Sequence, residues 1–192
     1  MRKENTTKYA VLGLLRVRPC SGYDLKKFSD MSLAHFWSEN YGHIYPVLKQ
    51  LKASKSVASE ERQTPGRPPK SVYRITEKGI RELEQWLGKP AERHPYRNEM
   101  LLKMFLSRDG SAPHLKDKVR AAREQSAVSL ATFKAIEERL KTSEPERSQP
   151  SLPLWLATLD FGKRTTQAEI EWCDATLRML EKLPAERKEA GR

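Results

Sequence analysis

The sequence predicts a mainly α-helical protein, with an α+β winged helix-turn-helix domain over residues 1–89 and a helical dimerisation domain over residues 90–192. Two observations predict this class. In the first half of the 192 residues, the periodicity of apolar residues follows the order helix, helix, helix, strand, strand, helix. In the second half, helical spacing continues almost without interruption, which favours long helices in antiparallel or coiled-coil packing.

The first two helices are marked by their ends. Thr6 or Thr7 can cap a helix that carries apolar residues as far as residue 15 and stops at Arg18-Pro19. Ser21, followed three residues later by Asp24, is a short-acid variant of the capping box. We therefore expect a second helix to begin at Ser21.

The third helix contains a proline among residues with helical spacing. A proline is tolerated in the first turn of a helix, where its missing N–H would have no partner. Pro46 therefore predicts a helix that begins near residue 42 or 43, with one face in the core and the other exposed. The predicted core residues are Ile44, Val47, Leu48 and Leu51, and the predicted exposed residues are His43, Tyr45, Lys49 and Gln50. Cationic and hydrogen-bonding side chains on the first turns of a helix are suited to the major groove of DNA.

Two short extended runs, residues 57–63 and 71–76, enclose a Gly/Pro-rich tip and predict a β-hairpin. Gly66 allows a tight turn, and Arg67 and Lys70 project positive charge. By itself, such a loop is more often exposed to solvent without a partner. When it lies beside a helix that reads the major groove, we expect it to contact the DNA backbone or the minor groove. Thr76 caps a fourth helix that ends near Gly88.

The second half predicts helices over residues 97–108, about 113–141 and 152–183. On the last helix, apolar or small residues recur at steps of three and four and form a seam typical of coiled coils. The members of this seam are Trp155, Leu159, Thr166, Ile170, Cys173, Leu177 and Leu180. We expect the seam to be the interface of a homodimer. An intramolecular helical hairpin is the alternative.

The net charge of +11 is unevenly distributed: residues 1–89 carry 17 Lys+Arg against 9 Asp+Glu, and residues 90–192 carry 19 against 16. An excess of basic residues favours double-stranded DNA as a partner, although a solvated face is an equal alternative on charge alone.

No apolar run is long enough to span a membrane, and no signal peptide is visible. Cys20 and Cys173 match no metal or disulfide spacing. We expect a cytoplasmic protein without cofactor or metal.

Enzymatic activity is not expected, because the four histidines are scattered and the chain has neither a Gly-rich phosphate loop nor a nucleophile elbow. A winged helix that binds another protein, without sequence-specific DNA binding, is the alternative function. The affinity of such a module should depend little on salt, whereas DNA binding should weaken steeply. Trp37, Trp86, Trp155 and Trp172 could line a pocket for a small aromatic effector, but tryptophans at helical spacing more often belong to the core.

Four motifs, SGYDLKK, GHIYPVLKQL, GRPPKSVYRITEKG and NEMLLKMF, resemble the PadR family of bacterial transcriptional regulators. The stretch from residue 155 to 183 resembles the longer subgroup with a virulence-activator-type, AphA-like, C-terminal domain. The resemblance implies a homodimer that is joined by its C-terminal helices and binds a partly palindromic operator, with one winged domain on each half-site. It also implies a protein that is associated with the nucleoid when bound to DNA. We expect a repressor, although no residue encodes the difference from an activator.

The family's functional positions can be carried over to this sequence. The recognition helix of the family falls on His43, Ile44, Tyr45 and Lys49, and its wing on Gly66, Arg67, Pro68 and Lys70. Tyr23 matches the SGY motif, which implies a phosphate contact; a half-buried aromatic residue is the alternative there. Many members of the family have a small polar residue or glutamine at the position of His43, so this histidine departs from their pattern.

Overall fold

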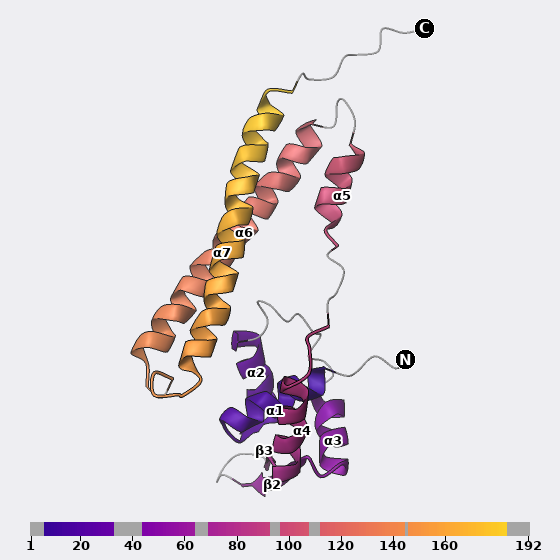
Figure 1. Cartoon of the computed structure of the whole chain (residues 1–192), viewed down its shortest axis with the longest axis vertical. Helices are drawn as coiled ribbons and strands as arrows, with labels where there is room; N and C mark the ends of the chain where they lie inside the picture. The colour runs from indigo at the N-terminus through magenta and orange to yellow at the C-terminus, as the bar shows by residue number, and fades with distance from the viewer. Residues whose placement is uncertain are drawn as a thin grey trace. The chain divides into compact units, whose positions relative to one another are not determined.

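A computed structural model describes residues 6–32, 44–63, 69–92, 97–107, 112–144 and 146–183. The chain divides into two compact units, Met1–Arg93 and His94–Arg192. Each unit has its own buried core. Figure 1 shows the helices and strands of both units along the chain.

The N-terminal unit is a winged helix with a three-stranded antiparallel sheet of order β1-β3-β2. Its elements are α1 (Thr7–Val17), β1 (Cys20–Ser21), α2 (Gly22–Ser32), α3 (Ile44–Ala53), β2 (Val57–Arg62), β3 (Lys70–Ile75) and α4 (Glu77–Leu87). The predicted order of helices and strands is confirmed. Strand β1 was not predicted, because two residues are too few for an alternating pattern; it pairs with Val72 and Tyr73 of β3.

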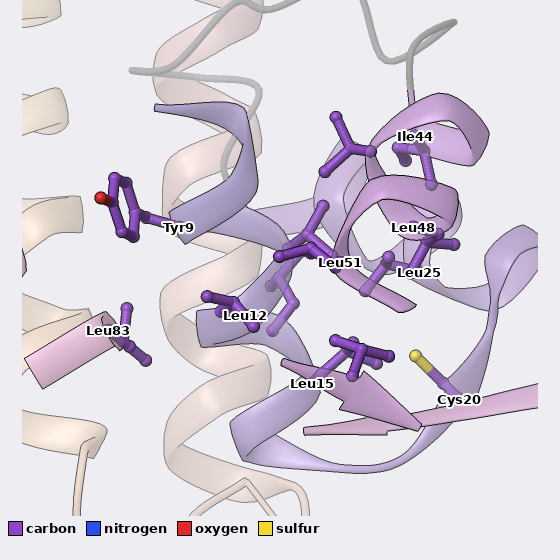
Figure 2. Close-up of a cluster of buried hydrophobic side chains, with 13 residues drawn as sticks. Tyr9, Leu12, Leu15, Cys20, Leu25, Ile44, Leu48, Leu51 and Leu83 are labelled. Carbon is purple, nitrogen blue, oxygen red and sulfur yellow. The ribbon is translucent and has the colours of Figure 1, made fainter. Parts of the chain in front are cut away.

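The core of this unit lies where α1, α2 and α3 meet. Leu12, Leu15 and Leu25 are almost completely buried, as are Ile44 and Leu48 of α3. Figure 2 shows these side chains converging, with Leu83 of α4 near Tyr9 at the edge. The burial of one face of α3 holds that helix by hydrophobic packing and leaves its opposite face exposed.

Two of the tryptophans that the structure describes, Trp86 and Trp172, take part in packing. The rings of Tyr9 and Trp86 stack with centroids 4.7 Å apart and planes 8° from parallel. Trp172 packs against the core of the C-terminal unit. These two residues therefore follow the interpretation as core, and Trp37 lies outside the described residues.

The start of α4 comes very close to the turn that follows α3. The Thr76 hydroxyl accepts a hydrogen bond from the N–H of Gly79 (3.2 Å) and donates one to the carbonyl of Lys55 (2.8 Å). A Cβ on Gly79 would lie 2.2 Å from the carbonyl oxygen of Ser56. Position 79 therefore requires glycine because the two backbones leave no room for a side chain.

The C-terminal unit consists of α5 (Glu99–Leu106), α6 (Ala112–Thr142) and α7 (Leu152–Glu181). Helices α6 and α7 form a long antiparallel hairpin (Figure 1). Leu115 and Val119 of α6 pack with Cys173 and Leu180 of α7 in its core. Three polar links also follow its length: Arg123 to Asp174 (2.5 Å), Ser126 to Glu169 (2.9 Å) and Glu137 to Lys163 (2.6 Å).

This hairpin corrects part of the predicted dimer seam. Thr166, Cys173 and Leu180 are at most 9% exposed in the single chain, so they have almost no surface to offer a second subunit. Cys173 and Leu180 pack with Leu115 and Val119 of α6 in the same chain, as the alternative of an intramolecular hairpin predicts. The periodicity correctly indicated a buried face, but it did not say which helix covers that face.

Candidate nucleic-acid interface

Helix α3 has one buried and one exposed face, as its sequence predicts. Tyr45 is 60% exposed, and Lys49 and Gln50 also face solvent. Pro46 lies in the first turn of the helix, where the absence of its N–H costs no hydrogen bond. The exposed face therefore presents a phenol, an ammonium and an amide side by side on consecutive turns.

The start of α2 lies against this face of α3. The Ser21 hydroxyl accepts a hydrogen bond from the backbone N–H of Asp24 (3.1 Å), which confirms the predicted cap. A Cβ on Gly22 would lie 2.7 Å from Cε1 of Tyr45, so the tyrosine ring rests directly on the glycine. Tyr23 is 69% exposed, which excludes its interpretation as a half-buried aromatic residue.

Strand β3 brings the base of the predicted wing to the same place. The Lys70 ammonium donates a hydrogen bond to the Asp24 carboxylate at 2.7 Å, which joins the beginning of β3 to the first turn of α2. The other predicted wing residues, Gly66, Arg67 and Pro68, lie outside the described residues, as does His43 ahead of α3.

These elements surround a hollow of about 510 Å³. The structure thus brings together three residues that the sequence predicted separately, Tyr23, Tyr45 and Lys70. Lys49 and Gln50 share the exposed face of α3 but do not line the hollow. The lining residues are Ser21, Gly22, Tyr23, Tyr45, Pro69, Lys70, Ser71 and Tyr73. The lining is mainly apolar, and its hydroxyl groups and ammonium add hydrogen-bond donors.

Asp24 was predicted only as a capping residue, and its contact with Lys70 was missed. The hydrogen bond from Lys70, followed by that from Ser21, lowers the pKa of Asp24 below its usual range. The carboxylate is therefore ionised at neutral pH. Asp24 and Lys70 are 46 residues apart, and contacts over such a separation leave no periodic pattern in the sequence. The two residues meet because β1, just ahead of α2, pairs with β3.

Among the described residues, neither a thiol nor a metal cluster offers a rival site for chemistry. Burial, together with the nearby Asp24 carboxylate, raises the pKa of the Cys20 thiol, so it stays protonated and packed in the core. Across the part of the chain that the structure describes, no cluster of His, Cys, Asp and Glu could hold a metal ion. In the same residues, no helix is both long and apolar enough to cross a membrane.

Two family models match the chain in sequence. The model of the transcriptional regulator PadR-like family matches residues 11–85. The model described as virulence activator alpha C-term matches residues 96–181. The two matches follow one another along the chain and together span most of it.

Curated relatives match over nearly the whole length of the chain. It is 28% identical over 183 residues to the probable transcriptional regulator Rv1176c of Mycobacterium tuberculosis, covering 90% of this chain and 96% of that protein. It is also 28% identical over 189 residues to the negative transcriptional regulator PadR of Bacillus subtilis, covering 91% and 97%.

Solved structures share the fold of the chain. Bacillus subtilis PadR in complex with operator DNA has a TM-score of 0.79 at 26% identity, covering 93% of this chain and 99% of that one. The same PadR in complex with p-coumaric acid has a TM-score of 0.70 at 26% identity, covering 95% and 99%. The Vibrio cholerae virulence activator AphA has a TM-score of 0.67 at 24% identity, covering 91% and 97%, which shows the fold alone.

A winged helix with a cationic exposed third helix, followed by a helical C-terminal domain, defines the class of winged-helix transcriptional regulators. Both halves of the chain identify the family more narrowly. The chain carries a domain of the transcriptional regulator PadR-like family over residues 11–85 and a virulence activator alpha C-term domain over residues 96–181. The members of this family are regulators of transcription and not enzymes.

Proposed function

We propose that the chain binds operator DNA with α3 in the major groove and the hairpin of β2 and β3 against the neighbouring backbone or minor groove. The observation that carries the proposal is the exposed face of α3, where Tyr45, Lys49 and Gln50 face solvent. The PadR of Bacillus subtilis, which has the same fold, was solved on operator DNA and supports the proposal.

Five further residues complete the proposed surface, and one of them is Lys70 at the beginning of β3. Tyr23, exposed at the start of α2, is the proposed phosphate contact from that helix. His43, Gly66 and Arg67 enter the proposal on the pattern of the family. Arg67 would contact backbone or minor groove, so its loss should weaken binding to every sequence alike.

A homodimer is proposed because the C-terminal unit leaves apolar surface uncovered. Phe105 and Leu106 of α5 are 87% and 66% exposed, and Leu154 and Phe161 of α7 are 70% and 67% exposed. Covering such surface with a second copy contributes about 25 cal/mol for each Å² of apolar area buried. Four residues of the predicted seam keep part of their surface accessible and remain in the proposed interface: Trp155, Leu159, Ile170 and Leu177.

Two winged domains in a symmetric dimer would bind the two halves of a partly palindromic operator. The half-sites should lie one helical turn of DNA apart, roughly 34–36 Å, or a multiple of that distance.

The PadR of Bacillus subtilis was also solved with p-coumaric acid. We therefore include a small aromatic effector in the proposal, although Trp86 and Trp172 are already engaged in packing. Such a regulator would work in the bacterial cytoplasm, on the nucleoid.

Selection of bound sequences from a random DNA pool tests the function directly, and an inverted repeat is the expected result. Tyr45→Ala and Lys49→Ala should each weaken binding to the selected site while the fold stays intact. Lys134→Ala is a charge-matched control, because this exposed lysine of α6 lies in the C-terminal unit. Unchanged binding by both α3 variants would overturn the assignment of the recognition helix.

The alternative of a protein–protein module makes a different prediction in the same system. A DNA-binding dimer that neutralises several phosphates should lose affinity steeply as salt rises. A shallow dependence on salt, together with no selected sequence, would favour the alternative.

A further inference from the structure

Asp24 is a carboxylate within the surface that is proposed to meet phosphate groups. Its Oδ2 accepts hydrogen bonds from the Lys70 ammonium (2.7 Å) and from the Ser21 hydroxyl (2.8 Å). The hydroxyl of Ser21 in turn caps the backbone N–H of Asp24 (3.1 Å). The carboxylate is thus held in place by the start of α2 while it binds a lysine of the wing strand.

The fold itself does not depend on this ion pair. The cap of α2 comes from Ser21, and β3 is held by its backbone pairing with β1 and β2. The side chains of Lys70 and Asp24 are 51% and 38% exposed, so solvent screens their attraction and the pair adds little to stability. Its main effect is on the charge that this surface presents to DNA.

Pairing with Asp24 removes the charge of Lys70 from the surface, and phosphate must compete with the carboxylate for it. Binding to DNA of arbitrary sequence is driven by neutralised phosphates and released counterions. Each cation withdrawn from the surface therefore weakens non-specific binding in particular. An acidic residue beside the hollow that Tyr23, Tyr45 and Lys70 line opposes such binding.

We propose that Asp24 is a positioning residue that sets DNA specificity through Lys70: it keeps the lysine paired on DNA of arbitrary sequence and so suppresses non-specific binding. The inference rests on the proposed function, because it requires this surface to be the DNA-binding surface. Lys70 then contacts a phosphate only on DNA that places a phosphate close enough to replace the Asp24 carboxylate as its partner.

The test measures binding of the full chain to a mixed-sequence duplex by fluorescence anisotropy, between about 0.05 and 0.2 M salt. Asp24→Asn should free Lys70 and steepen the plot of log affinity against log salt by about 0.9 for each subunit on the duplex. One added phosphate contact by the freed Lys70 corresponds to about 8-fold tighter binding at 0.1 M salt. Lys70→Ala should reverse the gain in the Asp24→Asn background and should change the slope less in the wild-type background, where the lysine is already paired.

Glu84→Gln is the matched control. Glu84 pairs with Arg16 at 3.1 Å, the pair is similarly exposed, and its loss changes the net charge by the same amount. Because neither residue lines the hollow, this variant should keep the wild-type slope. An equal steepening by Glu84→Gln would show that net charge alone is responsible and would overturn the inference.

Two other results would also overturn the inference while leaving the proposed function in place. One is an unchanged slope for Asp24→Asn, and the other is an equal reduction of the slope by Lys70→Ala in both backgrounds. A wild-type chain that binds no duplex at all would refute the proposed function, and the inference with it. Thermal unfolding of each variant shows whether a change in slope reflects a change in fold.

Discussion

Gly22 tests whether the position of the Tyr45 ring matters for DNA binding. In Gly22→Ala, the added Cβ would lie 2.7 Å from Cε1 and 3.2 Å from Cζ of Tyr45. Carbon atoms prefer separations of about 3.5–4.0 Å, so the ring must move by about 1 Å. Tyr45 is 60% exposed, which lets the ring move towards solvent without disturbing the core.

The expected effect of Gly22→Ala on stability is small. Replacing glycine with alanine restricts the unfolded chain and stabilises the folded one by about 0.4–1 kcal/mol. The loss of contact between the ring and the start of α2 should offset this gain. We therefore expect the free energy of unfolding, measured by urea denaturation, to stay within about 0.5 kcal/mol of the wild-type value.

The expected effect on DNA binding is larger. A displaced tyrosine at the centre of an interface should cost about 1–2 kcal/mol, or roughly 5- to 30-fold in affinity for the selected operator. Gly13→Ala is the control: no heavy atom lies within 4 Å of its added Cβ, and it should leave DNA affinity unchanged. If Gly22→Ala binds like the wild type while Tyr45→Ala binds weakly, the position of the ring is not what DNA binding requires. A loss of stability above about 2 kcal/mol would show that the ring cannot move away.

Three further predictions concern stability and assembly. Gly79→Ala should lower the free energy of unfolding by at least about 2 kcal/mol in urea denaturation, because its Cβ would meet a backbone carbonyl; a value near zero would contradict the close packing of α4. Hydrogen bonds from Lys141 and then Lys163 lower the pKa of Glu137 from 4.5 to about 2, so its stabilising effect is complete above pH 4.5 and is lost as the pH falls towards 2. In Glu137→Gln, the free energy of unfolding should fall by about 1 kcal/mol less over this pH range than in the wild type; the difference is small because solvent screens the group. Acid titrations of stability measure it, and parallel curves of unfolding free energy against pH for the two proteins would refute the prediction. Phe105→Asp should leave the folded chain intact but weaken dimers at least about 100-fold in light scattering, because a charge would replace an 87% exposed ring in the proposed interface.

The helices and strands of the N-terminal unit could be predicted because each has a local signal at its ends. Ser21 and Thr76 cap helices in the structure as their sequence context predicts, and Pro46 lies in the first turn of α3. Capping and proline effects depend on neighbours within a few residues, so the sequence contains them completely. The exposed face of α3 follows directly from the burial of the opposite face.

The geometry of the candidate site could be predicted only in part, because its contacts join distant segments. The pairing of Asp24 with Lys70 and the packing of Tyr45 on Gly22 depend on how α2, α3 and β3 come together. Strand β1, which helps to place them, has two residues and no periodicity of its own. The sequence therefore indicated which side chains belong to the surface, but not which of them interact.

The α7 seam shows how far periodicity can determine an interface. A stripe at steps of three and four requires a covering surface, and α6 of the same chain satisfies that requirement at Thr166, Cys173 and Leu180. The close approach of the two helices is visible at Gly162, where a Cβ would lie 2.9 Å from the ring of Phe133. Because α6 covers these residues, a partner chain would have to bury other apolar side chains. Phe105 of α5 is the most exposed of those described. We therefore expect the dimer interface to have its centre at α5, which the periodic pattern did not select, and to include the outer face of α7 with the four seam residues that stay partly accessible.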